Sequence, residues 1–130
     1  MKLPFVLRAG SKASAQILQH GFDADSLAAF GAPAGGPKFI IQSHLDRFLF
    51  AQWLPQRKQA LPAFGSSIGA FRLLAAAHPD PAAAAERLYQ AYCRQHYASK
   101  PTAADISREV KDILHTVLQA DDIEYILNHP

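Results

Sequence analysis

The chain is poor in the features that mark secreted and membrane-bound proteins. Its 130 residues include a single cysteine, Cys93, so no disulfide can form within the chain. Small secreted domains commonly depend on several disulfides, so we predict a cytoplasmic location and expect Cys93 to be a buried structural thiol. The apolar residues 3–7 are interrupted by Pro4 and end at Arg8, which is too short for a signal peptide. No apolar run approaches the roughly 20 residues that span a membrane, and no transmembrane segment is predicted.

The chain also lacks a large excess of positive or negative charge. The 13 basic and 11 acidic residues give a net charge of +2 and are scattered, without a basic run. Nucleic-acid-binding proteins carry a clustered basic surface, so we predict no nucleic-acid partner. No pair of histidines or cysteines has the H-E-x-x-H or C-x-x-C spacing of a zinc site. We therefore predict no metal and no cofactor.

Internal repeats are absent as well, and the length fits a single domain over residues 1–130. Short apolar runs beside glycine or proline predict strands near residues 3–8, 27–32 and 60–66. Helical patterns cover residues 11–20, 37–54, 82–97, 102–118 and 121–128. The predicted fold class is α/β, with a short, mainly parallel sheet of two or three strands flanked by about five helices and a helical C-terminal half.

Capping residues mark several of these helix starts. Ser11 opens the first predicted helix, and Asp80 stands before a proline that fits a first helical turn. Thr102 with Asp105 resembles a capping box, and Asp121 with an acidic residue three positions later is a similar signal.

The most informative feature of the chain is the sequence Gly65-Ser66-Ser67-Ile68-Gly69. It lies between an apolar run and a helix that begins near residue 70, which is the context of a nucleophile elbow. Such a turn is crowded, and small residues are needed two positions before and after the nucleophile. Gly65 and Gly69 meet this requirement when Ser67 is the nucleophile. If Ser66 were the nucleophile, two large apolar residues would occupy the crowded positions.

A glycine-rich turn, Gly35-Gly36-Pro37-Lys38, follows the preceding predicted strand. Gly35 and Gly36 can offer unobstructed backbone N–H groups before a helix whose positive end favours an anion. Together with the N–H of Ile68, they can form an oxyanion hole, and Lys38 can orient the loop or add positive potential. One βαβ unit separates the two turns, so both should lie at the carboxyl edge of the sheet.

The glycine turn followed by the serine turn resembles the patatin-like phospholipases, whose pattern is G-G-x-R/K and then, one helix and one strand later, G-x-S-x-G. Residues 45–47 and 66–72 are similar to a bacterial branch of that family. The resemblance implies an α/β fold, an acyl-ester or lipid substrate and a Ser-Asp dyad. It implies Ser67 as the nucleophile and the loop residues Gly35, Gly36 and Lys38 as part of the oxyanion hole.

The chain departs from the family pattern in two ways. Phe39 stands where the family loop usually has another glycine. The family places its catalytic aspartate in a D-G-G or D-G-A motif, and the chain has no Asp-Gly pair. The aspartates after Ser67 are better explained as helix caps or solvated positions; they are Asp80, Asp105, Asp112, Asp121 and Asp122. We therefore expect an incomplete domain, the N-terminal portion of such a hydrolase, with little turnover of its own.

Three alternatives remain open from the sequence. A Ser-Asp-His triad can be assembled with His115 or His129, although the lack of later strands counts against it. An acyltransferase or thioesterase can use the same elbow. A non-catalytic α/β domain can instead associate with itself or with another chain, and the aromatic-rich segment 39–54 suits a partner surface, although burial against the sheet is favoured.

Overall fold

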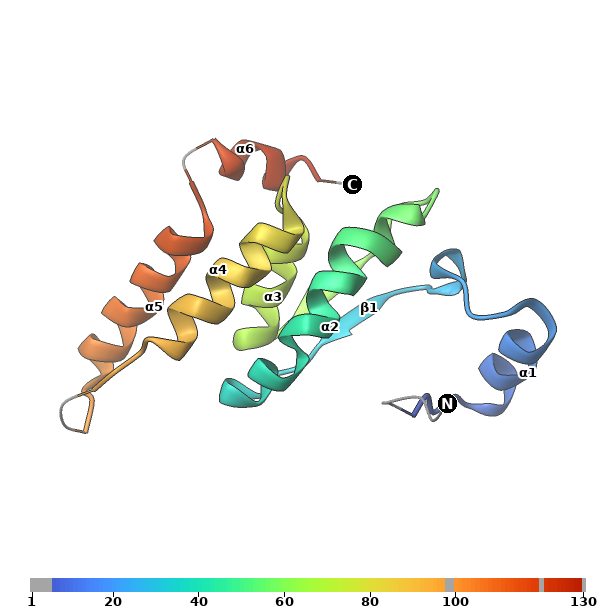
Figure 1. Cartoon of the computed structure of the whole chain (residues 1–130), viewed down its shortest axis with the longest axis horizontal. Coiled ribbons are helices and arrows are strands. Elements are labelled where there is room, and N and C mark those ends of the chain that lie inside the picture. Colours follow the sequence, from blue (N-terminus) through green and yellow to red (C-terminus); the bar gives the residue numbers. More distant parts are fainter. Residues whose placement is uncertain (1–5, 98–99, 120, 130) are drawn as a thin grey trace.

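Two short parallel strands and six α-helices form the part of the chain that the computed structural model describes, residues 6–97, 100–119 and 121–129 (Figure 1). This confirms the predicted mixed α/β class with a short parallel sheet. The strands are β1, Phe30–Ala32, and β2, Ala63–Gly65. The helices are α1 Ser11–His20, α2 Ser43–Phe48, α3 Ile68–Ala76, α4 Pro81–Cys93, α5 Ala103–Val117 and α6 Asp122–Leu127.

The third predicted strand is not present in the described residues. Residues 3–5 lie outside them, and residues 6–8 have no regular structure because the two-stranded sheet offers them no pairing partner. The number of α-helices is six rather than about five. Two cap predictions are also wrong, because Gly10 rather than Ser11 precedes α1 and the Asp121 side chain caps nothing.

The strands pair in parallel with Phe30 opposite Ala63 and Ala32 opposite Gly65. The Ser66 N–H extends the ladder by donating to the Ala32 carbonyl at 3.1 Å. Parallel pairing brings both carboxyl ends to one edge. The turns that follow β1 and β2 therefore lie beside each other, as the βαβ pattern predicts.

The connection between the strands is helical over residues 36–56 but is not one regular helix. It begins as a 3₁₀ helix over Gly36–Gln42, continues as α2, widens to a π-helix over Leu49–Trp53 and ends with a 3₁₀ turn over Leu54–Gln56. Proline near each end explains part of this irregularity. Pro55 lacks the N–H group that would donate to the Ala51 carbonyl in a continuing α-helix.

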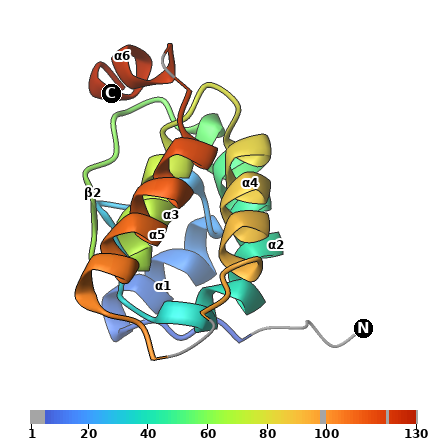
Figure 2. The same cartoon turned by 90° about the vertical axis from the view of Figure 1, so that its left-hand side faces the viewer.

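Helix α4 lies at the centre of the helical layer and packs against α2, α3 and α5 (Figures 1 and 2). Small alanine side chains at the α3–α4 contact let the two helix backbones come close. Larger apolar side chains fill the core between α4 and α5. The buried residues of this core are Phe39, Ile68, Ala75, Ala84, Ala85, Leu88, Ile113 and Val117. Helix α1, by contrast, has no buried residue and lies at the opposite end of the molecule from α5 (Figure 1).

One face of the sheet is covered and the other is open. Alternate strand residues point to opposite faces. Ala32 is buried, and Phe30 makes an edge contact with Phe50 of the π-helical segment, so this face meets the helices. On the other face the Phe64 ring lies over Gly31 and is 69% exposed. Both faces of a parallel sheet are normally covered, so this sheet is only partly enclosed in the described residues.

Within the described ranges, no helix combines the length and the apolar character that crossing a bilayer requires.

Candidate active site

Ser67 sits on the turn that joins β2 to α3. Its backbone angles are φ 54° and ψ −129°, and it is the one non-glycine residue with a positive φ in the described part of the chain. Side chains make this region unfavourable, and occupying it costs on the order of 1–3 kcal/mol. Hydrogen bonds on both sides hold the turn, from the Gly69 N–H to the Ser66 carbonyl and from the Ala70 N–H to the Ser67 carbonyl, both at 2.9 Å.

The two flanking glycines are required by close backbone contacts. A Cβ atom on Gly69 would lie 1.9 Å from the carbonyl oxygen of Ala32, and a Cβ on Gly65 would lie 2.7 Å from the backbone nitrogen of Ala70. Neither neighbour can move without breaking the strand-to-helix turn. The end of β1 therefore packs directly against the first turn of α3, which is why the glycine spacing around Ser67 cannot vary.

The glycine loop follows β1 at the same edge of the sheet. Gly36 has φ +52°, a conformation that suits glycine, and the Lys38 N–H donates to the Gly35 carbonyl at 3.2 Å. Among the hydrogen bonds of the described residues, none uses the N–H groups of Gly35, Gly36 or Ile68. The Lys38 side chain is exposed. This edge thus carries three backbone N–H groups that have no acceptor in the described part of the chain.

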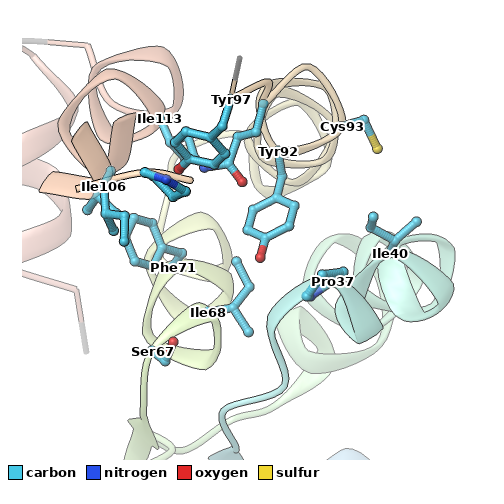
Figure 3. A pocket seen from close by; sticks show the side chains of 13 residues that line it. Pro37, Ile40, Ser67, Ile68, Phe71, Tyr92, Cys93, Tyr97, Ile106 and Ile113 are labelled. Carbon is cyan, nitrogen blue, oxygen red and sulfur yellow. The ribbon is translucent and has the colours of Figure 1, made fainter. Parts of the chain in front are cut away.

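A pocket of about 650 Å³ opens beside Ser67 (Figure 3). Its walls come from the start of the 3₁₀ helix, from α3, from the end of α4 and from α5. The lining is mainly apolar and comprises Pro37, Ile40, Ser67, Ile68, Phe71, Tyr92, Cys93, Gln95, Tyr97, Pro101, Ile106, Val110 and Ile113. Of the residues expected at the site, Ser67 and Ile68 line this pocket, and the glycine loop borders it through Pro37.

No carboxylate or imidazole lines this pocket among the described residues. The later aspartates have other surroundings. Asp80 accepts from the Ala83 N–H and caps α4, and Asp105 forms the predicted capping box with Thr102. Asp112 and Asp121 are exposed. Ser67 therefore has no general base in the part of its pocket that the structure describes.

The nearest approach to an acid–base pair is His78 with Asp122. His78 is 7% exposed; its Nε2 lies 2.7 Å from the Asp122 carboxylate, and its Nδ1 accepts from the Asp80 N–H at 2.8 Å. A hydrogen bond from the Gln119 N–H, followed by the His78 contact, lowers the pKa of Asp122. The pair lies beyond the far end of α3, about 13 Å of helix away from Ser67, so it cannot serve as its base.

The histidines considered for a triad also fail to reach the elbow. His115 is exposed on α5 and is not in the pocket lining. His129 stacks edge-on against Tyr125 and lines a second pocket, which contains neither Ser67 nor the glycine loop. The described geometry assembles no Ser-Asp-His triad.

A buried ion pair behind the site was not anticipated from the sequence. Arg72 of α3 donates from Nε and Nη2 to the two carboxylate oxygens of Asp46 in α2, at 2.7 and 2.6 Å. Both residues are almost fully buried. The pair joins the helix after the glycine loop directly to the helix after Ser67. Both residues lie in the segments that resemble the bacterial patatin-like branch, but pairing across 26 residues has no local sequence signal.

Two further residues line the pocket. Tyr92 was not predicted from the sequence, and Cys93 was expected to be buried. Tyr92 stands one helical turn after buried Leu88, and this spacing could have placed it on the inner face of α4. Burial, and secondarily Tyr97, raises the pKa of the Tyr92 hydroxyl. Cys93 is exposed rather than buried, and α4 ends at this residue instead of continuing to residue 97.

In the described residues, no three His, Cys, Asp or Glu side chains gather closely enough to hold a metal ion. Comparison of the chain with models of known protein families, with curated proteins and with solved structures gives no match.

Proposed function

We propose that the chain is the nucleophile-bearing part of a patatin-like serine acyl hydrolase that acts on acyl esters such as lipids. The observation that carries this proposal is the backbone of Ser67. A serine held at φ 54° between two glycines whose Cβ positions are blocked is an unfavourable arrangement with no evident packing benefit. Strain of this kind concentrates at functional sites.

In the proposed reaction, the Ser67 Oγ attacks the ester carbonyl carbon and loses its proton to a base. The N–H groups of Ile68, Gly35 and Gly36 then receive the negative oxygen, because they have no other acceptor in the described residues. The alcohol leaves with a proton, and water releases the acid from the acyl-serine. The apolar pocket holds the acyl chain beside Ser67, and Lys38 adds positive potential near the loop.

The base has to come from outside the described residues, and this makes the proposal testable by chemical rescue. Imidazole added as an external base should increase the hydrolysis of p-nitrophenyl butyrate by the protein. Imidazole also cleaves this ester directly, so the informative quantity is the imidazole-dependent rate above that of the Ser67→Ala variant. We expect a saturable excess for the unaltered chain.

Ser66→Ala is the matched control, because Ser66 is adjacent, exposed and not at the strained position. It should retain the excess rate that Ser67→Ala loses. Equal rates for the unaltered chain and Ser67→Ala at every imidazole concentration would reject Ser67 as a nucleophile and favour a non-catalytic interaction domain. Acyl transfer to an added alcohol or thiol in the same assay would identify the transferase or thioesterase alternative.

A further inference from the structure

The described pocket lining contains three residues with a hydroxyl group, Ser67, Tyr92 and Tyr97. Tyr92 is the one that lies close to the glycine loop. It comes from α4, and Figure 3 shows its hydroxyl directed into the pocket toward Pro37 and Ile68. The Oη atom lies 3.8 Å from the position that a Cβ on Gly36 would occupy. The hydroxyl therefore lies close to the glycine loop, within the pocket that also borders Ser67.

The ring of Tyr92 is held in place by the core. It meets the ring of Phe39 edge to face, with centroids 5.0 Å apart and planes at 84°, and Phe39 is 4% exposed. Such contacts contribute about 0.5–1.5 kcal/mol beyond burial and fix the orientation of the ring. The hydroxyl thus has a defined position, in contrast to that of a side chain free to rotate into solvent.

No hydrogen bond of the described residues involves the Tyr92 hydroxyl. The pocket around it is mainly apolar, and although Ser67, Gln95 and Tyr97 also line it, no hydrogen bond joins any of them to the Tyr92 hydroxyl in the described residues. Tyr92 is only half-buried, so its hydroxyl is open to the pocket and can bond to solvent or to a ligand there. Burial raises the pKa of this hydroxyl, so at neutral pH it remains protonated and can donate.

We infer that Tyr92 is a specificity-determining residue whose hydroxyl donates a hydrogen bond to an oxygen of the bound acyl ester. The inference rests on the proposed ester site at Ser67 and adds a side-chain donor to its backbone donors. It assigns the pocket two functions: the apolar wall accepts a hydrocarbon chain, and Tyr92 selects a ligand with an oxygen acceptor near the glycine loop. A hydrocarbon of similar size gains nothing from Tyr92.

Binding measured in the Ser67→Ala background tests this without any reaction at Ser67. Methyl-labelled isoleucines at Ile68, Ile106 and Ile113 report the pocket by NMR during titration with methyl octanoate or with toluene, which has no oxygen. One neutral hydrogen bond corresponds to about a fivefold change in affinity. Adding Tyr92→Phe should weaken methyl octanoate binding about fivefold and leave toluene binding unchanged. The ring and its contact with Phe39 are retained in that variant.

Tyr89→Phe is the matched control, since Tyr89 lies on the same helix as Tyr92 but does not line the pocket. It should leave both affinities unchanged. Equal methyl octanoate affinity with and without the Tyr92 hydroxyl would overturn the inference. So would a loss of toluene binding as large as the loss of methyl octanoate binding. The absence of methyl octanoate shifts at the three isoleucines would also overturn it, because the ester would then not bind in the pocket. Failure of the proposed hydrolase appears separately, as the absence of imidazole-dependent hydrolysis at Ser67.

Discussion

Ser67 has a backbone conformation that its own side chain disfavours. The turn is maintained by the contacts around it, because the end of β1 and the first turn of α3 meet at Gly69 with no space for a side chain. The strain is therefore imposed by the strand-to-helix junction, directly after the Ser66 N–H extends the strand ladder, and Ser67 is exposed there. Position 67 combines exposure with a fixed backbone, which is what a nucleophile needs.

Replacing Ser67 with glycine should stabilise the protein. Glycine adopts a positive φ without steric cost, so relief of strain should exceed the added entropy of the unfolded chain, for a net gain of about 1 kcal/mol. Urea unfolding followed by circular dichroism gives the free energy of unfolding. Ser66→Gly is the control and should destabilise, since φ at Ser66 is not positive. A loss of stability in Ser67→Gly as large as in the control would show that Ser67 is not strained.

At the scale of elements, the Asp46–Arg72 pair links the two helices that follow the candidate site's loops. A buried carboxylate and guanidinium satisfy each other through two parallel hydrogen bonds, and removal of one partner leaves an uncompensated charge. The pair itself need not add net stability, because both charges were taken out of water.

Asp46→Ala should therefore lower the free energy of unfolding by about 3–5 kcal/mol. The double variant Asp46→Leu/Arg72→Met should recover most of this loss, because it removes both charges and keeps apolar volume between α2 and α3. Chemical denaturation of the single and double variants measures the difference. A double variant as unstable as Asp46→Ala would indicate that the two helices need the ionic contact itself.

Helix α5 starts with a capping box that depends on pH. The Thr102 side chain accepts from the Asp105 N–H, and the Asp105 carboxylate accepts from the Thr102 N–H and hydroxyl, which lowers the pKa of Asp105. A lowered folded-state pKa contributes stability above the ordinary value of 3.8 and loses it as pH falls through the lower value.

Thermal unfolding of the unaltered chain and of Asp105→Asn should thus differ at pH 7, with the variant less stable. The difference should shrink as pH falls below 3.8 and the carboxylate becomes protonated. Asp112→Asn, at an exposed position of the same helix with no capping contact, should show no such pH-dependent gap. A constant difference for Asp105→Asn across this range would exclude the carboxylate as its cause.

At the scale of the whole molecule, the Ser67 turn and the glycine loop lie at one edge of a sheet that has only two strands in the described residues. All three residues of β2 are exposed, and within residues 6–97, 100–119 and 121–129 nothing buries the ring of Phe64, which is 69% exposed. Parallel sheets with both flanks covered are the rule for α/β enzymes. The described residues therefore leave this face of the sheet uncovered and place no carboxylate or imidazole in the pocket beside Ser67.

The sequence was sufficient for the parts of this arrangement that depend on neighbours in the chain. Glycine and proline punctuation around residues 30 and 65, together with the right-handed crossover, predicted that the two turns lie side by side. The pairing of Asp46 with Arg72 and the placement of Tyr92 close to Gly36 depend on contacts between distant segments. Helix α4 ends four residues before the predicted end, and Cys93 is exposed; neither follows from the alanine-rich sequence, which favours a longer helix.

Modification by a fluorophosphonate tests the central claim, that Ser67 is a positioned nucleophile without its base, most directly. In this reaction the Ser67 Oγ bonds to phosphorus, fluoride leaves and the hydroxyl proton passes to solvent or to an added base. Peptide mass spectrometry over time locates and quantifies the adduct. The account expects slow modification confined to Ser67, accelerated by imidazole and retained in Ser66→Ala. Modification of Ser67 no faster than that of Ser66 would contradict the nucleophile, and rapid modification without imidazole would contradict the missing base.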